Sequence, residues 1–217
     1  MASQIVPEFK LKDRFADKSQ KSIVNTGGDI LVHVKADSVG RCHEVMKSVL
    51  KELEGSTVMW SEDFQGFRPD SGNVVMCPPT YYSSTVACSV ACVPKVGNSY
   101  ALFQKWDDDI STSKGKAKLV SNHAARMFGL DDEGKKLNIV RQTMRTGKLG
   151  SKGNEDKAGM LFVAYSKDPR IFDYMLDRMV GKRGSVEDNT LATTKCTRSQ
   201  LFIVPSDTQV RSLANFH

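Results

Sequence analysis

The chain has 217 residues, of which 40% are hydrophobic and 26% charged. This is the composition of an ordinary globular protein that is long enough to bury a core, and no apolar run reaches the roughly 18 residues of a membrane helix. The formal net charge is +6, but the basic residues are scattered among acidic ones without a basic stripe interleaved with aromatics. Nucleic-acid binding is therefore not expected.

The five cysteines are odd in number and include no CxxC pair, and the N-terminus has no secretory apolar region. These features favour free thiols over disulfides. They predict an intracellular, reducing location, in the cytoplasm or the mitochondrion. The first residues mix acids with bases, unlike an acid-poor transit peptide, and a removed presequence remains an open alternative.

The chain begins with a polar, aperiodic arm over residues 1–28. Apolar and polar residues then alternate over 29–35, which predicts a strand with one face on a core. Residues 39–54 carry apolar side chains at helical spacing, behind an Asp-Ser cap and before a glycine, which predicts a helix packed on a sheet. Residues 56–61 predict a second strand.

The middle of the chain contains three further predicted strands, of which the first covers residues 74–77. Residues 84–93 are small, β-branched and thiol-rich, as in a buried strand. Residues 99–106 form an alternating segment after a turn, which predicts a strand. The three aspartates at 107–109 are interpreted as a solvated turn. Adjacent carboxylates at the exposed end of a strand more often cap the next element than bind a metal ion.

Three residues in the second half have side chains suited to redox chemistry. His123 stands before a polar turn, and Arg141 and Thr143 lie in the extended segment 139–144. A histidine can hold haem iron, and an arginine can stabilise charge that develops on a bound peroxide. Spacing alone does not show that these three residues form a haem site, because a lone histidine is more often a surface or core residue.

The closing part predicts a strand, a helix and a strand. Residues 159–165 are the first strand. The helix over 168–180 begins at an Asp-Pro pair, presents a stripe of aromatic, Leu and Met side chains, and ends at Gly181. Residues 199–206 are the final strand. Together with the first part, the pattern predicts an α+β protein with two strand–helix–strand units.

Several of these segments resemble the dye-decolourising (DyP-type) haem peroxidases. The segment 121–126 (SNHAAR) is similar to the family's proximal-histidine motif, and 139–143 (IVRQT) to its distal-arginine motif. The strand 99–106, the Asp-Pro helix and the final Leu-Phe-x-Val-Pro-Ser run resemble the family's second domain. The resemblance extends over about residues 28–215 and is strongest from 97 to 210.

The resemblance implies a two-domain ferredoxin-like fold of the dimeric α+β barrel type. After the arm over 1–28, it implies a partial first domain over 29–95 and a second domain over 96–217. It also implies that His123 is the axial ligand of haem b, that Arg141 is the distal arginine and that Thr143 supplies a distal hydroxyl. No metal other than haem iron is implied.

The chain departs from the family pattern in three places. The distal Gly-x-x-Asp-Gly motif is replaced by 70–79 (DSGNVVMCPP), which retains only a displaced Asp-Ser-Gly. Only 16 residues separate Trp106 from His123, where the family has a longer helical segment. The opening half of the first domain has no counterpart.

These departures leave two functional hypotheses open, with a haem-binding protein without turnover, such as a sensor or carrier, between them. The favoured hypothesis is a catalytically degenerate DyP-type protein that serves as a structural or assembly subunit and binds no haem. The alternative is a haem peroxidase that reduces hydrogen peroxide while oxidising a donor by one electron at a time, with Arg141 and Thr143 as catalytic residues. Because an incomplete sheet leaves an open edge, we expect a homo-oligomer or a complex with other protein subunits.

Overall fold

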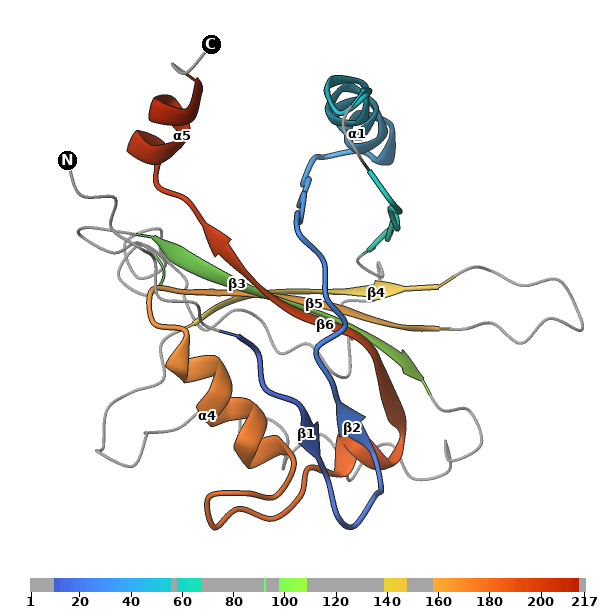
Figure 1. The fold of residues 1–217 in the computed structure, drawn as a ribbon. Helices are drawn as coiled ribbons and strands as arrows, with labels where there is room; N and C mark the ends of the chain where they lie inside the picture. Colours follow the sequence, from blue (N-terminus) through green and yellow to red (C-terminus); the bar gives the residue numbers. More distant parts are fainter. Residues whose placement is uncertain are drawn as a thin grey trace, which may run out of the picture. The chain divides into compact units, whose positions relative to one another are not determined.

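The computed structural model describes residues 10–55, 58–67, 92, 98–108, 139–147 and 158–214. The chain divides into two compact units. Unit 1 comprises Met1–Gly27 and Gln65–His217, and unit 2 comprises Gly28–Phe64. Unit 1 contains the four-stranded sheet drawn in Figure 1. The arm and the second half of the chain therefore belong to one compact body, although 37 residues of unit 2 separate them in the sequence.

The sheet of unit 1 is antiparallel throughout. Its strands are β3 (Ser99–Asp108), β4 (Val140–Thr146), β5 (Gly159–Ser166) and β6 (Thr194–Val204), in the order β4-β5-β3-β6. The predicted strands over 99–106, 159–165 and 199–206 are thus present, and β6 begins five residues earlier than predicted. With a helix between β5 and β6, this is the predicted α+β, ferredoxin-like architecture.

Helix α4 (Arg170–Met179) connects β5 to β6 and supplies much of the core. The carboxylate of Asp168 accepts a hydrogen bond from the backbone N–H of Arg170 at 3.1 Å and so caps the first turn. The predicted stop also holds, because Gly181 takes the left-handed conformation with φ +83°. Four buried side chains of α4 pack on the sheet: Phe172, Met175, Leu176 and Met179. Each contributes about 1.5–3 kcal/mol.

The N-terminal arm forms a short hairpin on the same side of the sheet as α4 (Figure 1). Its strands are β1 (Arg14–Phe15) and β2 (Ser22–Ile23), and its side chains Leu11, Ala16 and Ile23 are buried in the same core cluster as α4. A hairpin this short is not stable by itself, so its order depends on this packing. The 3-10 helix η3 (Asn189–Ala192) completes this layer, and α5 (Asp207–Ala214) follows β6.

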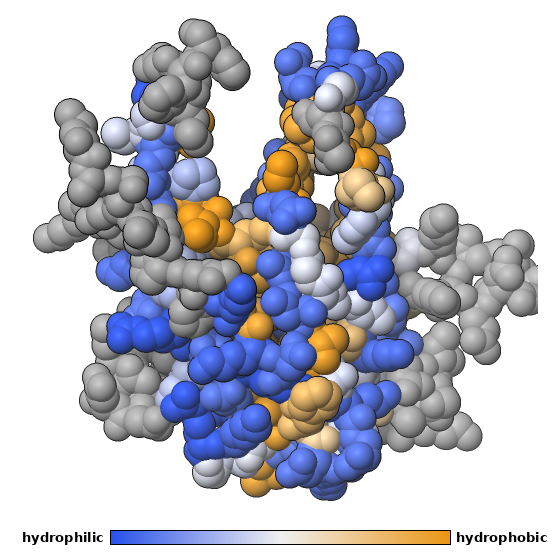
Figure 2. Space-filling view, viewed as in Figure 1, coloured by the Kyte–Doolittle hydropathy of each residue, from blue (hydrophilic) through white to orange (hydrophobic). Residues whose placement is uncertain are grey.

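Unit 2 corrects two sequence-based expectations. Helix α1 (Val39–Glu52) is present with Ser38 as its N-cap, but none of its residues is buried, and its expected packing on a sheet is not observed. The described residues at 29–35 and 58–61 form no strand. Apolar side chains lie on the surface of unit 2, as Figure 2 shows. The large exposed ones are Ile30, Val32, Val39, Val45, Leu50, Val58, Met59 and Trp60. An alternating or helical pattern identifies an apolar face, but a strand still needs a partner strand to form.

Candidate functional site

The two faces of the sheet differ, and the register assigns each side chain to one of them. Successive side chains in a strand point to opposite faces, and directly paired residues share a face. One face, here called the α4 face, carries four rows of paired residues: Arg141–Ala164–Leu102–Leu201, Thr143–Phe162–Gln104–Ser199, Arg145–Met160–Trp106–Cys196, and Ser166–Tyr100–Ile203. Most of these apolar side chains belong to the core cluster with α4.

Arg141 and Thr143 are two residues apart on β4, so both project from the α4 face. Arg141 is only 8% exposed, with Ala164 as its cross-strand neighbour, and Thr143 is half-buried opposite Phe162. A guanidinium and a hydroxyl therefore stand beside apolar side chains. In such a low-dielectric setting, a hydrogen-bond donor or a positive charge acts more strongly on an anionic oxygen than it would in water.

Arg145, the next residue on this face of β4, forms an ion pair with Asp108 at the end of β3. The distance from Nη2 to Oδ2 is 2.8 Å, and the two side chains are 26% and 12% exposed. The backbone of Arg145 also forms a bridge with Phe67, with N···O distances of 2.9 and 3.1 Å. Arg145 is thus held at both its backbone and its side chain.

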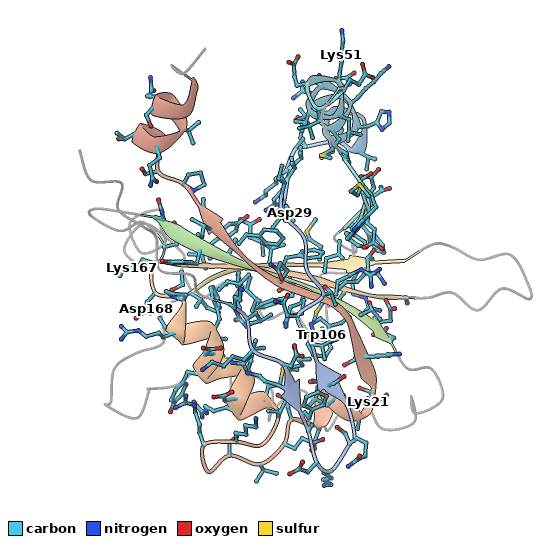
Figure 3. All side chains as sticks on the ribbon, in the orientation of Figure 1. Lys21, Asp29, Lys51, Trp106, Lys167 and Asp168 are labelled. Carbon is cyan, nitrogen blue, oxygen red and sulfur yellow. The ribbon has the colours of Figure 1, made fainter. Side chains whose placement is uncertain are left out.

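A buried hydrogen-bonded chain lies on the α4 face, and its Gln104 and Ser199 share a row with Thr143, from which Phe162 separates them. The side-chain amide of Gln104 donates to Ser199 Oγ at 2.9 Å, and its carbonyl accepts from the indole Nε1–H of Trp106 at 3.3 Å. All three residues are at most 3% exposed, and Figure 3 shows Trp106 on the side of the sheet where the β1–β2 hairpin lies. Satisfied buried polar groups of this kind fix side-chain positions.

The thiol of Cys196, on the same face, is chemically quiet. Burial raises the pKa of Cys196 to about 12, with a smaller contribution from the negative charge of Asp107. A protonated, buried thiol is neither a nucleophile nor a metal ligand. Within the described ranges, no group of three or more His, Cys, Asp or Glu side chains is arranged to hold a metal ion.

Several predicted site features lie outside the described residues. They are His123, the segment 70–79 that replaces the distal Gly-x-x-Asp-Gly motif, and most of the predicted strand at 84–93. The structure therefore places Arg141 and Thr143 together on one face, and His123 remains a prediction. Among the described helices, none is long and apolar enough to cross a membrane.

Sequence reasoning missed the Gln104 chain, although a signal for it is present. Tyr100, Leu102, Gln104 and Trp106 point the same way on β3, so one amide stands in an otherwise aromatic or aliphatic row. A polar residue at an inward position of a strand indicates a buried hydrogen bond. Its partner Ser199 is 95 positions away and could not be identified from the sequence.

Comparison with known proteins gives one consistent result. The sequence family described as "Dyp-type peroxidase, C-terminal" matches residues 104–209. The dye-decolorizing peroxidase of Mycolicibacterium paratuberculosis is 26% identical over 219 residues, which cover 83% of this chain and 58% of the relative. The chain thus spans about three-fifths of the length of the curated relatives it matches.

Solved structures agree at the level of the fold. A DypB variant of Rhodococcus jostii RHA1 in complex with heme superimposes with a TM-score of 0.78 at 25% identity, and the match covers 94% of this chain and 74% of that one. The encapsulated DyP-type peroxidase from Mycobacterium smegmatis has a TM-score of 0.75 at 21% identity, over 95% and 74% of the two chains. The second likeness concerns the fold alone.

Proposed function

Because the chain belongs to the dye-decolourising peroxidase family, we propose that it binds haem b through His123 and reacts with hydrogen peroxide on the side of the haem that faces Arg141. The observation that carries the proposal is the placement of Arg141 and Thr143 on the α4 face, combined with the connectivity of the sheet.

The connectivity supports bringing His123 to the same face. Strands β3 and β4 are both antiparallel to β5, so they are parallel to each other. Two parallel strands of one sheet need a crossover connection between them. Likewise β5 and β6 are parallel, and α4 forms their connection. About 98% of such crossovers are right-handed. The step from β5 to β6 starts from a strand that runs opposite to β3, and it moves across the sheet in the opposite direction to the step from β3 to β4. These two reversals cancel, so two crossovers of the same handedness lie on the same face of the sheet.

We infer from this rule that His123, which lies between β3 and β4 in the sequence, is on the α4 side of the sheet. The residues on that face fit a haem–peroxide site. Ala164 and Phe162 supply apolar surface beside Arg141 and Thr143, as ligand pockets with a few polar groups do. The guanidinium of Arg141 supplies a fixed positive charge for the oxygen that becomes anionic when peroxide is cleaved.

The residues of the chain then have separate roles. Bound haem would supply the iron and the electrons that reduce peroxide. The imidazole of His123 would hold that iron. Arg141 binds and polarises peroxide, and Thr143 donates its hydroxyl hydrogen to a peroxide oxygen. The missing distal aspartate removes a group that could carry a proton between the two oxygens, and such a loss lowers the rate by about 10²–10⁴.

The experiment is stopped-flow absorption of the haem-loaded protein mixed with hydrogen peroxide. We expect a slow but peroxide-dependent spectral change that Arg141→Leu abolishes and Arg41→Leu preserves. Arg41 is a matched control because it lies on α1 with its side chain 68% exposed. A reaction unaffected by Arg141→Leu would contradict the proposed role of Arg141.

A second candidate is the degenerate structural subunit, in which the same fold serves assembly without haem. It is favoured by the altered segment at 70–79 and by the exposed apolar side chains of unit 2, since large exposed apolar surfaces indicate a protein partner. In this candidate the partner is a second copy or another protein subunit. Multi-angle light scattering that gives an oligomer for a protein unable to bind haem would favour it over the peroxidase.

A further inference from the structure

The N-terminal arm is attached to the layer that carries the candidate site. Three polar attachments accompany the packing of its apolar side chains. They are Arg14 on α4, the turn at Lys18 and Ser19 on Glu187, and Thr26 on β6. The carboxylate of Glu187 accepts both backbone N–H groups of that turn at 2.9 Å. The described part of the arm is therefore fixed on β1, at the turn of the hairpin and at its end.

Arg14 makes the most buried of these attachments. Its side chain is 1% exposed and lies between two aspartates one helical turn apart on α4. Nε donates to Asp177 Oδ1 at 2.8 Å, Nη2 pairs with Asp173, and Nη1 donates to the carbonyl of Lys12 at 2.6 Å. A buried guanidinium is tolerated only when it is paired in this way, so the position of the arm and that of α4 depend on each other.

Thr26 connects the end of the arm to the buried chain on the α4 face. Its backbone N–H donates to the carbonyl of Ser199 at 2.9 Å, and its Oγ1 accepts from the backbone N–H of Ser199 at 3.1 Å. Ser199 Oγ then accepts from Gln104, whose cross-strand neighbour Phe162 lies opposite Thr143. One row of side chains thus leads from the arm to the proposed peroxide side.

We propose that the arm is a positioning element of the site, with Arg14 and Thr26 as its positioning residues. Arg14 holds α4 onto the face, and Thr26 fixes Ser199 and through it Gln104 and Phe162. This inference rests on the proposed function, and it assigns a role to a segment some 115 residues away from Arg141 and Thr143 in the sequence. The arm touches neither haem nor peroxide; it acts through the row of residues on the sheet.

The test compares two variants with two controls in the full-length chain. Thr26→Val keeps the side-chain shape and removes the hydroxyl, and Arg14→Met removes the guanidinium. Thr197→Val is the first control, because Thr197 lies on β6 with only weak contacts to Lys105 at 3.4 Å. Arg183→Met is the second, because Arg183 pairs with the same Asp177 while its side chain is 38% exposed.

The first readout is titration with haemin at a temperature at which far-UV circular dichroism shows every variant folded. Partners behind a haem or metal ligand typically change affinity by about 10–100-fold when removed. We expect Kd to rise about tenfold in Thr26→Val and Arg14→Met, the lower end of that range, because both act indirectly. We expect Arg14→Lys, which keeps the charge, to recover part of the loss, and both controls to stay within about twofold of the wild type.

The second readout, amide hydrogen exchange without haem, separates failure of this inference from failure of the proposed function. The inference predicts faster exchange at β4, around Thr143, in Thr26→Val and Arg14→Met but not in the controls. If only the arm and α4 exchange faster and the haemin Kd is unchanged, Arg14 and Thr26 are merely structural and the inference is wrong. If the wild type binds no haemin, the proposed function fails, and unchanged exchange at β4 would overturn the positioning role as well.

Discussion

Arg145 of β4 and Asp108 of β3 form an ion pair across the intervening strand β5, with 2.8 Å between Nη2 and Oδ2. The pair links two strands that share no backbone hydrogen bond, at the end of the sheet where both strands terminate. With side chains 26% and 12% exposed, it is intermediate between a surface pair and a buried one.

We therefore expect Arg145→Met and Asp108→Asn each to lower the free energy of unfolding by about 1–3 kcal/mol, between the values for surface and buried pairs. The double variant should cost less than the sum of the single ones, because the second change removes a charge that has already lost its partner. The pair Arg41–Asp37, with side chains 68% and 70% exposed, is the control and should show almost no coupling. Additive costs at Arg145 and Asp108 in urea unfolding would contradict the prediction.

Phe172 and Leu50 illustrate how the structure changes an expectation from sequence. Both lie on apolar helical stripes, but Phe172 is 1% exposed on α4 and Leu50 is 41% exposed on α1. We expect Phe172→Ala to lower the free energy of unfolding by about 3–5 kcal/mol, and Leu50→Ala by less than about 1 kcal/mol. Equal costs in chemical denaturation would show that α1 has a buried face after all.

The strand pairing of β3 with β5 predicts a strong effect at Gly159. A Cβ at this position would lie 2.2 Å from the backbone carbonyl oxygen of Trp106, and a backbone atom cannot move aside cheaply. Gly159→Ala should therefore destabilise unit 1 by about 2 kcal/mol or more. Gly40→Ala is the control, because its nearest neighbour is Ser38 Oγ at 4.0 Å and alanine favours a helix by about 1 kcal/mol. A similar melting temperature for both variants would contradict the observed register.

The buried thiol of Cys196 predicts a pH dependence. Burial raises its pKa from 9.0 to about 12, so the unfolded chain loses the thiol proton at a lower pH than the folded protein does. The stability that depends on the protonated thiol is complete below pH 9 and is lost as the pH rises toward 12. The free energy of unfolding of the wild type should therefore fall more steeply with pH than that of Cys196→Ala between pH 9 and 12. The difference corresponds to at most about a tenfold change in the unfolding constant per pH unit. Parallel pH curves for the two proteins would argue against the shift.

The sequence predicted those strands and that helix of unit 1 whose apolar faces pack against other elements of unit 1. The strands around Leu102, Phe162 and Leu201 and the helix around Phe172 have strong periodicity, clear start and stop residues, and partners in the same sheet. The strands predicted at 29–35 and 56–61 have the right alternation, but the described residues there form no ladder, since alternation cannot supply the neighbouring strand.

The candidate site was predictable in part, for a similar reason. Arg141 and Thr143 have the same parity on one strand, so their common face follows from the sequence. The partner of Arg14 could not be predicted, because Asp173 and Asp177 lie 159 and 163 residues further along the chain. The sequence indicated an arm, and only the structure identified α4 and β6 as the elements to which it is attached.

The absorption spectrum of the protein reconstituted with haemin tests the central claim most directly. The account predicts a Soret band typical of histidine-ligated haem in the wild type and in His43→Ala, an exposed histidine of α1, and its loss or a large shift in His123→Ala. A wild type without a Soret band, or a band unchanged in His123→Ala, would contradict the claim that this chain holds haem through His123.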